Sequence, residues 1–259
     1  MNILSQIVRD TLQRVKKEKK KTPIEELNYN DSSNRSLSEA IKSHSETPVI
    51  GELKKTSPSS NEIRSNFPVV KLAESIANGG AAGISVLTEP DYFDGSMEYI
   101  KKVKAAVDIP ILRKDFIVDE YQIYQTAAVG ADAVLLIAEV LEDKLPIFVD
   151  LTKDLDMEPL VEIRNEDQAN LAEAAEADLI GINNRDLNTM KTDLSRTENL
   201  IEQVLKDSVI VSESGVESRK DVERLLKAGS DAVLVGTAIM KSNNVEDKVR
   251  NLVFGDNHG

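Results

Sequence analysis

Eight short runs of apolar, largely β-branched residues recur along the chain from residue 48 onward, and their spacing most constrains the fold. The runs lie ~20–35 residues apart, which leaves room for one helix between neighbours. Near-continuous apolar runs are typical of strands that are buried on both faces, as in parallel sheets. The runs are 48–53, 83–87, 109–112, 133–138, 159–163, 179–182, 209–211 and 232–235.

Helical patterns lie between these runs. The periodicity predicts helices over 69–78, 121–129, 168–175 and 220–228, several of which end on Gly or Asn before the next run. The segments 130–135 (GADAVL) and 229–234 (GSDAVL) form a weak internal repeat. Alternating β and α units in this number predict an α/β fold, a (βα)8 TIM barrel with an N-terminal helical extension. A doubly wound open sheet is the alternative.

The first 47 residues differ from the rest of the chain. Apolar residues between 3 and 15 share one helical face, which predicts a helix over residues 1–21. The lysine-rich run 16–21 suits a helix C-terminus. We expect these lysines to form a solvent-exposed face of the helix, and a site that binds polyanions is the alternative. We expect residues 1–47 to be an extension packed on the barrel, and residues 48–259 to form a single catalytic barrel domain.

The composition excludes several kinds of chemistry. Cysteine is absent, which excludes disulfides, thiolate zinc sites, iron–sulfur clusters and a cysteine nucleophile. The chain has only 2 histidines, at 44 and 258, so we do not expect a Ser-His-Asp triad or a histidine-rich metal site. We therefore expect no metal, and any acid–base chemistry must use Lys, Glu, Asp, Arg or Tyr.

The charge balance argues against polyanionic partners. The chain has 32 Lys+Arg against 45 Asp+Glu, a net charge of −13, which disfavours nucleic acid and anionic membranes. No apolar run approaches the ~18 residues of a membrane span. The first residues lack the basic and apolar regions of a secretory signal, so we expect a cytoplasmic protein.

Charged and polar residues cluster where the predicted strands end. In a βα barrel the carboxyl ends of the strands form the reactive face. Glu52 and Lys54 are two residues apart and share one face of the first strand, and Leu112 and Lys114 do the same in the third. Glu162 follows the same rule in the fifth. These side chains are predicted to meet in the mouth of the barrel.

Each of these residues also has a structural alternative. Lys114 or Glu162 could form a salt bridge at the rim, and Glu52 could simply pair with Lys54. Arg185 could cap a loop, and Asn183 could satisfy backbone groups.

Small, glycine-bearing turns follow the seventh and eighth strands. Ser214-Gly215 and Gly236-Thr237 present backbone N–H groups without bulky side chains. In this architecture these two turns often hold a phosphate. We expect an anionic substrate here, opposite Lys54 and Lys114 and attracted by a local reversal of the field. The alternative is that the glycines serve only tight turns.

At these residues the chain resembles the indole-3-glycerol phosphate synthase family of tryptophan biosynthesis. The matching segments occur in family order and cover residues 48–240, with LRKDF and GINNRDL the most discriminating pair. They are ELKKTSP (52–58), SVLTEPDYFDGS (85–96), PILRKDFIVDEYQIY (110–124), GADAVLLI (130–137), PLVEI (159–163), LIGINNRDL (179–187), SESG (212–215) and DAVLVG (231–236).

The resemblance implies a carboxy-lyase that uses no cofactor. The implied substrate is 1-(2-carboxyphenylamino)-1-deoxyribulose 5-phosphate, whose ring closes onto the ribulose carbonyl with loss of carbon dioxide and water. It implies a small phosphorylated substrate and no nucleic-acid or membrane partner. We expect a monomer, with association with other enzymes of the tryptophan pathway as a further expectation.

The family's roles fall on matching residues. The resemblance makes Lys114 the general acid, Glu162 the later base, and Lys54 the carboxylate partner with Glu52 as its acidic companion. It makes Asn183 and Arg185 orienting residues. The implied substrate-binding residues are Ser57, Ser214, Gly215, Gly236 and Thr237 for the phosphate, Phe93, Phe116, Leu135 and Leu187 for the aromatic ring, and Glu213.

An acid lysine works best near neutrality when its pKa is lowered. We expect burial and a neighbouring lysine to lower the pKa of Lys114, with nearby glutamates opposing them.

Three residues depart from the family pattern, and two other functions stay open. Asn61 stands where the family has glycine, Thr237 where it has Glu or Ser, and Arg164 where many relatives have His. Thr237 keeps a hydroxyl donor, whereas Asn61 is expected to stiffen the loop after the first strand. The alternatives are another phosphate-binding barrel, either a sugar-phosphate isomerase or a Schiff-base aldolase using Lys54 or Lys114, and a barrel without activity.

Overall fold

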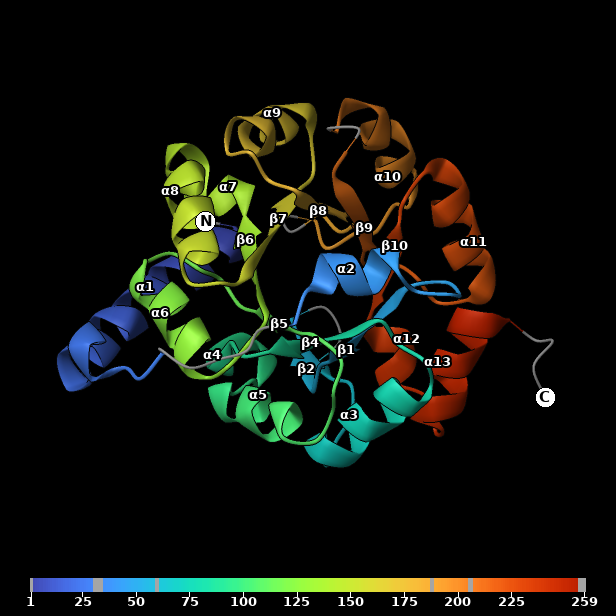
Figure 1. The fold of residues 1–259 in the computed structure, drawn as a ribbon, viewed down its shortest axis with the longest axis horizontal. Coiled ribbons are helices and arrows are strands. Elements are labelled where there is room, and N and C mark those ends of the chain that lie inside the picture. The colour runs from blue at the N-terminus through green and yellow to red at the C-terminus, as the bar shows by residue number, and fades with distance from the viewer. Residues whose placement is uncertain (1, 30–34, 59–60, 187–188, 205–206, 256–259) are drawn as a thin grey trace.

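A closed barrel of parallel strands occupies the centre of the molecule in the computed structural model (Figure 1). The structure describes residues 2–29, 35–58, 61–186, 189–204 and 207–255. The order around the barrel is β1-β10-β9-β8-β7-β6-β5-β4. The barrel strands are β1 (Val49–Leu53), β4 (Gly83–Leu87), β5 (Ile111–Lys114), β6 (Ala133–Ile137), β7 (Glu158–Ile163), β8 (Leu179–Asn183), β9 (Val209–Glu213) and β10 (Ala232–Val235). The predicted (βα)8 barrel is confirmed, and the open sheet is wrong.

Helices surround the strands, as the βα alternation requires (Figure 1). The helices outside the first 47 residues are α3 (Val69–Asn78), α4 (Pro90–Phe93), α5 (Met97–Lys104), α6 (Tyr121–Ala128), α7 (Ala138–Leu141), α8 (Leu145–Asp154), α9 (Glu166–Ala174), α10 (Ser195–Leu200), α11 (Arg219–Ala228), α12 (Thr237–Met240) and α13 (Val245–Phe254). Short 3₁₀ turns are η2 (Glu142–Lys144) and η3 (Ile201–Gln203). The four helices predicted from periodicity are confirmed within two residues at each end.

Several strands run further toward their carboxyl ends than their apolar runs predict. The predicted run 109–112 is strand Ile111–Lys114, because Pro110 has no N–H and the ladder begins after it. Likewise β9 extends from the predicted Val211 to Glu213. Charged residues normally mark strand ends, but here they point into a barrel mouth where partners satisfy them.

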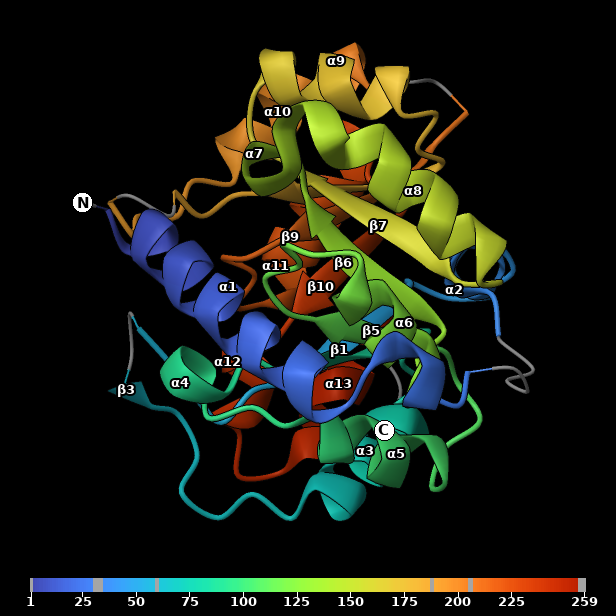
Figure 2. The ribbon, with the colours of Figure 1, turned by 90° about the vertical axis from the view of Figure 1, so that its left-hand side faces the viewer.

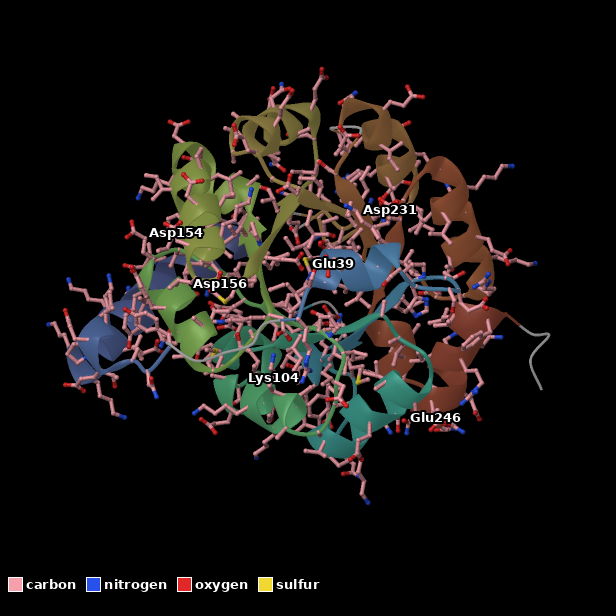
Figure 3. The ribbon with its side chains drawn as sticks, viewed as in Figure 1. Glu39, Lys104, Asp154, Asp156, Asp231 and Glu246 are labelled. Atoms are coloured by element: carbon pink, nitrogen blue, oxygen red, sulfur yellow. The ribbon has the colours of Figure 1, made fainter. Side chains whose placement is uncertain are left out.

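The repeated Asp of the two similar segments has a structural role. Asp132 accepts a hydrogen bond from the N–H of Ile111 at 2.8 Å, and Asp231 accepts one from Ile210 at 2.7 Å. Each carboxylate thus ties the start of its strand to the neighbouring strand. Lys104 of α5 also binds Asp132, and it lies on the face shown in Figure 3, where the strands begin. The internal repeat therefore stabilises the end of the barrel opposite its mouth.

The first 47 residues reach both ends of the barrel. Helix α1 (Ile3–Lys21) lies near the carboxyl ends of the strands, where Arg14 pairs with Asp115 and Tyr92 donates to Asp10. After a short 3₁₀ turn, η1 (Ile24–Glu26), helix α2 (Leu37–Lys42) covers the opposite end (Figures 1 and 2). There Glu158 at the start of β7 accepts hydrogen bonds from the first turn of α2.

Buried apolar side chains form one layer inside the barrel and another between strands and helices. The inner layer includes Leu112, Leu160 and Leu234 from the strands together with Leu37 and Ile41 of α2, all nearly inaccessible to water. Leu4 and Ile7 of α1 join it from the other end. Because these side chains fill the lower half of the barrel, the open space is confined to its mouth.

A short β-hairpin projects from the loop after β1. It pairs β2 (Thr56–Ser57) with β3 (Asn61–Glu62) in antiparallel fashion. Asn61, the departure from the family glycine, lies in this pair opposite Ser57. An extended pair accepts an asparagine as readily as a glycine.

Candidate active site

A cavity of about 440 Å³ opens at the carboxyl ends of the strands. Every candidate residue lines it except two. Leu187 lies outside the described residues, and Glu213 is fully buried. The candidates that line it are Glu52, Lys54, Ser57, Phe93, Lys114, Phe116, Leu135, Glu162, Asn183, Arg185, Ser214, Gly215, Gly236 and Thr237.

Lys114, at the end of β5, reaches across the barrel to two carboxylates. Its Nζ donates directly to Glu213 Oε2 from β9, and it lies 4.0 Å from Glu162 Oε2 on β7. The side chain of Lys114 is only 16% exposed, and those of both glutamates are almost completely buried. The barrel thus brings together residues that are far apart in sequence, as the strand parity predicts.

The carboxylates control the protonation of Lys114. Burial alone would lower the pKa of Lys114, since a charge is poorly solvated inside a protein. The opposing charges are those of Glu213, Glu162 and Glu52, in that order. They outweigh burial and raise the pKa of Lys114 above its ordinary value. The expected lowering is therefore wrong, because three carboxylates face this one ammonium.

The pKa of Glu162 is also raised, but in its case burial is the dominant cause. Burial raises the pKa of the Glu162 carboxyl to about 7, assisted by repulsion from Glu213 and opposed by the Lys114 ammonium. Among the described residues, its Oε1 has no hydrogen-bond partner. A carboxyl of this kind can accept or release a proton near neutral pH, as a general base must.

Glu52 and Lys54 form a close ion pair at the carboxyl end of β1. The Lys54 Nζ lies 2.5 Å from Glu52 Oε2, which confirms the pairing that the sequence left open. Burial opposes ionisation of Glu52, but the ammonium groups of Lys54 and Lys114 hold the pKa of the Glu52 carboxyl below its ordinary value. Both residues of the pair also line the cavity, so a structural bridge and a place at the cavity coexist.

Two strand glycines make room for these carboxylates. A Cβ at Gly181 of β8 would lie 2.1 Å from Glu213 Oε1, and a Cβ at Gly236 would lie 2.0 Å from Glu52 Oε2. Any side chain there would displace the carboxylate. Gly236 therefore has a packing role in addition to its exposed backbone.

The predicted phosphate turns lie together at one side of the mouth. Ser214 and Gly215 both have positive φ angles, 68° and 87°, which bend the chain sharply after β9. Gly236 leads into α12, whose first residue is Thr237. A Cβ at Gly215 would lie 2.4 Å from the Thr192 methyl, so glycine also lets the loop after β8 pack on this turn.

An aromatic wall faces these turns across the cavity. The rings of Phe93 and Phe116 have centroids 6.1 Å apart, and Leu135 lies beside them in the lining. Such apolar surface suits a flat aromatic group.

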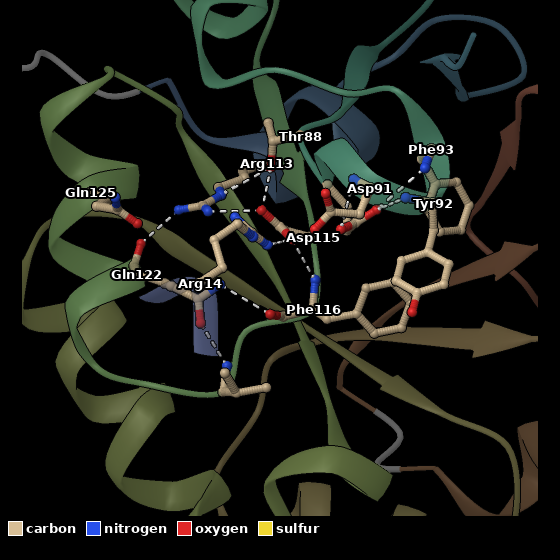
Figure 4. A network of polar contacts seen from close by, with 12 residues as sticks. Arg14, Thr88, Asp91, Tyr92, Phe93, Arg113, Asp115, Phe116, Gln122 and Gln125 are labelled. Carbon is tan, nitrogen blue, oxygen red and sulfur yellow. Dashed lines mark hydrogen bonds and ion pairs between the residues drawn. The ribbon is translucent and has the colours of Figure 1, made fainter. Parts of the chain in front are cut away.

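A buried polar network holds this wall and the end of β5 (Figure 4). Arg113, only 1% exposed, donates to Asp115 at 2.8 Å and to the carbonyl of Gln122. Asp115 also accepts from Thr88 and from the N–H of Phe116. Lys114 therefore stands between two residues that are fixed in the core.

These findings frame the comparison with known proteins. The sequence model for indole-3-glycerol phosphate synthase matches residues 4–252. The indole-3-glycerol phosphate synthase of Thermoanaerobacter pseudethanolicus is 43% identical over 257 residues and covers 97% of both chains. That of Methanocaldococcus jannaschii is 43% identical over 267 residues, with 98% of this chain and 100% of the relative covered.

The chain belongs to the indole-3-glycerol phosphate synthase family. Its function is therefore the synthesis of indole-3-glycerol phosphate, and it is a carboxy-lyase of tryptophan biosynthesis. A solved structure of thiamine phosphate pyrophosphorylase from Pyrococcus furiosus has a TM-score of 0.62 at 18% identity. It covers 84% of this chain and 96% of its own, and this likeness supports the barrel fold alone.

Asn183 and Arg185, which were predicted to orient the substrate, contact each other at the edge of the cavity. Asn183 accepts a hydrogen bond from the N–H of Arg185 at 2.9 Å. Arg185 donates to the carbonyl of Met190 at 2.9 Å, so it does stabilise a loop, and it lines the cavity as well. Arg164, the departure from the family histidine, forms an ion pair with Glu139 of α7.

Sequence reasoning missed several residues of the synthase's cavity. Met190, Thr192, Leu194, Glu217 and Lys241 all line it, yet none belongs to a motif. Arg113 and Asp115 lie beside Lys114 in the LRKDF motif, at the end of a predicted strand. Nothing in the sequence pattern distinguished their roles from that of Lys114.

Charge in the cavity is balanced. Its lining holds four basic residues, Lys54, Lys114, Arg185 and Lys241, and four acidic ones, Glu52, Asp115, Glu162 and Glu217. The lining thus carries balanced formal charge before the buried Glu213 beside Lys114 is counted, and it does not show the predicted reversal of the field. Across the part of the chain that the structure describes, no cluster of three or more His, Cys, Asp or Glu could hold a metal, and no helix is long and apolar enough to cross a membrane.

Proposed function

We propose that Lys114 and Glu162 carry out the acid and base steps of the synthase reaction on 1-(2-carboxyphenylamino)-1-deoxyribulose 5-phosphate. The observation that supports this assignment most is their separation of 4.0 Å within a cavity that also contains the two phosphate turns. One group is held as an ammonium and the other has a pKa of about 7. A single substrate can therefore meet a proton donor and a proton acceptor together.

In the first step the ring carbon that bears the carboxylate attacks the ribulose carbonyl. As the carbon–carbon bond forms, the carbonyl oxygen gains negative charge and takes a proton from the Lys114 ammonium. A high pKa does not prevent this transfer, since an alkoxide is a far stronger base than an amine. The carboxylates around Lys114 stabilise its ammonium form until negative charge develops on the carbonyl oxygen.

Loss of carbon dioxide and water completes the reaction. The carbon–carboxylate bond breaks, and its electron pair restores the aromatic ring. The new hydroxyl takes a further proton from Lys114, which solvent has reprotonated, and leaves as water, while Glu162 takes a proton from the adjacent carbon and returns it to Lys114. One proton from solvent is consumed overall, because a carboxylate departs as neutral carbon dioxide.

The remaining residues are proposed to bind and orient the substrate. Lys54, held by Glu52, pairs with the substrate carboxylate, and Asn183 and Arg185 orient the ribulose chain. Glu213 is proposed to act on the substrate indirectly, through the Lys114 ammonium that it contacts. The phosphate lies at Ser57, Ser214, Gly215, Gly236 and Thr237, and the aromatic ring lies against Phe93, Phe116 and Leu135, with Leu187 also assigned to that wall.

Schiff-base chemistry fits the cavity less well. A lysine must be a neutral amine to attack a carbonyl. The raised pKa of Lys114 keeps it protonated, and Lys54 is bound to Glu52. Borohydride trapping of a keto-sugar phosphate on lysine would favour that alternative.

We also retain four organisational proposals. Residues 1–47 form an extension packed on a catalytic barrel of residues 48–259. The enzyme acts in the cytoplasm as a monomer, and it associates with other enzymes of the tryptophan pathway. Measurement of the mass in solution, alone and with those enzymes, tests the last two.

Replacing Lys114 tests the acid assignment. Lys114→Met keeps the length of the side chain and removes the proton, and we expect a loss in kcat of at least ~10²-fold. Fluorescence of the indole product follows turnover directly. Lys220→Met, on the exposed face of α11, is the matched control and should keep full activity. Near-full activity of Lys114→Met would remove Lys114 from the mechanism.

A further inference from the structure

Lys241 lines the cavity beside the phosphate turns, and no step above uses it. It follows α12 directly, and its N–H donates to the carbonyl of Thr237 at 3.0 Å, one helical turn earlier. Side chains on a helix lean toward its N-terminus, and residues four apart share a face. The stem of Lys241 therefore leans back toward Thr237 and the turn at Gly236.

Lys241 differs from the other basic residues of the cavity in its partners. Lys54 and Lys114 bind carboxylates, and Arg185 donates to a backbone carbonyl. Among the residues that the structure describes, no hydrogen bond or ion pair engages the side chain of Lys241, and the residue is exposed. Its charge is thus available to a ligand.

The backbone around Lys241 is fixed by an arginine from another loop. Arg64, which follows β3, donates from Nη1 to the carbonyl of Met240 at 2.8 Å and to that of Ser242 at 3.0 Å. These are the two residues that flank Lys241. One guanidinium therefore holds the backbone on both sides of the lysine without engaging its side chain.

The turns themselves supply no cation. Ser214, Gly215, Gly236 and Thr237 offer only backbone N–H groups and hydroxyls, whereas a phosphate ester carries a charge of about −1.5 to −2 near neutral pH. A charge-assisted hydrogen bond is roughly twice as strong as a neutral one. The Lys241 ammonium, at the edge of this site, supplies a charge that complements the phosphate.

We propose that Lys241 is an additional phosphate-binding residue, which closes over the substrate's phosphate as an ionic contact and is positioned by Arg64. This inference rests on the proposed placement of the phosphate at the two turns. Lys241 touches the phosphate and none of the reacting atoms. Its contribution is therefore the same in the ground state and the transition state, and it appears in KM rather than in kcat.

The first test is direct binding of inorganic phosphate, measured by calorimetry without turnover. Lys241→Gln should raise the Kd about three- to tenfold, as expected for one partly solvated charged contact. Lys241→Arg should restore most of the affinity. Lys220→Gln, the same change of charge on α11 away from the cavity, should leave the Kd unchanged. Added salt should weaken wild-type binding more than Lys241→Gln binding.

The second test uses the substrate. Lys241→Gln should raise KM by a similar factor while kcat stays within about twofold. In a double-mutant cycle, Arg64→Gln should weaken phosphate binding in the wild-type background and have a much smaller effect in the Lys241→Gln background. Equal effects of Arg64→Gln in both backgrounds would overturn its positioning role.

Thr237→Val separates the two ways in which the inference could fail. If Thr237→Val weakens phosphate binding and Lys241→Gln does not, the turns bind phosphate and the role of Lys241 is wrong. If neither variant weakens binding, the phosphate lies elsewhere, and the placement proposed above fails together with this inference. If both weaken it, and Lys220→Gln does not, the proposal stands.

Discussion

Lys114 is surrounded by more negative charge than its own charge can neutralise. Glu213 contacts it directly, Glu162 lies 4.0 Å away, and Glu52 adds a weaker attraction. Within this group the Glu162 carboxyl keeps its proton up to about neutral pH. The protonation of Glu162 is therefore set first by burial and second by repulsion from Glu213, whereas attraction to the same carboxylates keeps Lys114 an ammonium.

The pH dependence of catalysis should report this repulsion. Glu162 must be ionised to act as a base, so kcat/KM in the wild type should fall as the pH drops through about 7. Glu213→Gln removes the charge that, after burial, contributes most to the raised pKa of Glu162. The acidic limb should then move to lower pH.

A pH profile of kcat/KM checks this expectation. Glu173→Gln, on the exposed side of α9, is the control and should leave the limb in place. An acidic limb at the same pH in Glu213→Gln and wild type would contradict the proposed coupling.

Strand parity identified Glu52, Lys54, Lys114 and Glu162 at the mouth, because alternation along a strand is a local property that a sequence displays. The direct contact between Lys114 and Glu213 joins residues on strands at separate places around the barrel. Nothing local encodes that contact, and the direction of the Lys114 pKa shift depends on it. The same reason explains why Lys241 was missed.

At the scale of elements, the end of β5 is anchored in the core by a buried ion pair. Its Arg113 is fully buried, binds Asp115 and also donates to Thr126 of α6 at 2.9 Å. Apolar periodicity predicted the strand but placed its end two residues early. An arginine in the core looks like a surface residue until its carboxylate partner is known.

Removing this anchor should be costly. Arg113→Met leaves the buried Asp115 carboxylate without its main partner, and we expect a loss of about 3–5 kcal/mol in the free energy of unfolding. Urea unfolding monitored by circular dichroism measures the loss. In Arg113→Met/Asp115→Asn the charge itself is gone, so stability should partly recover. A loss below about 1 kcal/mol in the single variant would show that the pair is not a structural anchor.

For the whole molecule, the raised pKa of Glu162 has a thermodynamic cost. Its folded-state pKa is about 7, against an ordinary value of 4.5. Between these values the folded state binds more protons than the unfolded state, so stability falls as the pH rises from one to the other. Above about pH 7 the cost is complete, and below about pH 4.5 it is absent.

Glu162→Gln should therefore stabilise the protein in a pH-dependent way. We expect a gain of about 1–3 kcal/mol at about pH 8 and almost none at about pH 4. Urea unfolding at the two pH values measures both, with Glu173→Gln as the control for loss of a surface carboxylate. An equal gain at both pH values, or a loss at about pH 8, would refute the linkage.

The overall architecture followed from sequence because each βα unit shows its own apolar run and helical face. The open alternative could be rejected only from the β1–β10 pairing, which joins the first barrel strand to the last. Residues 22–47 are polar and carry little periodicity, so the placement of α2 under the barrel was not predicted. Its partner, Glu158, lies more than a hundred residues away.

The contacts that α1 and α2 make with the barrel have a consequence for folding during synthesis on the ribosome. Both helices are translated before any barrel strand, yet α1 binds Asp115 and α2 binds Glu158. Helix α1 thus cannot make its contact before residue 115 has emerged, and α2 cannot make its contact before residue 158 has emerged. These two helices therefore reach their final places only after barrel strands that are translated later than they are.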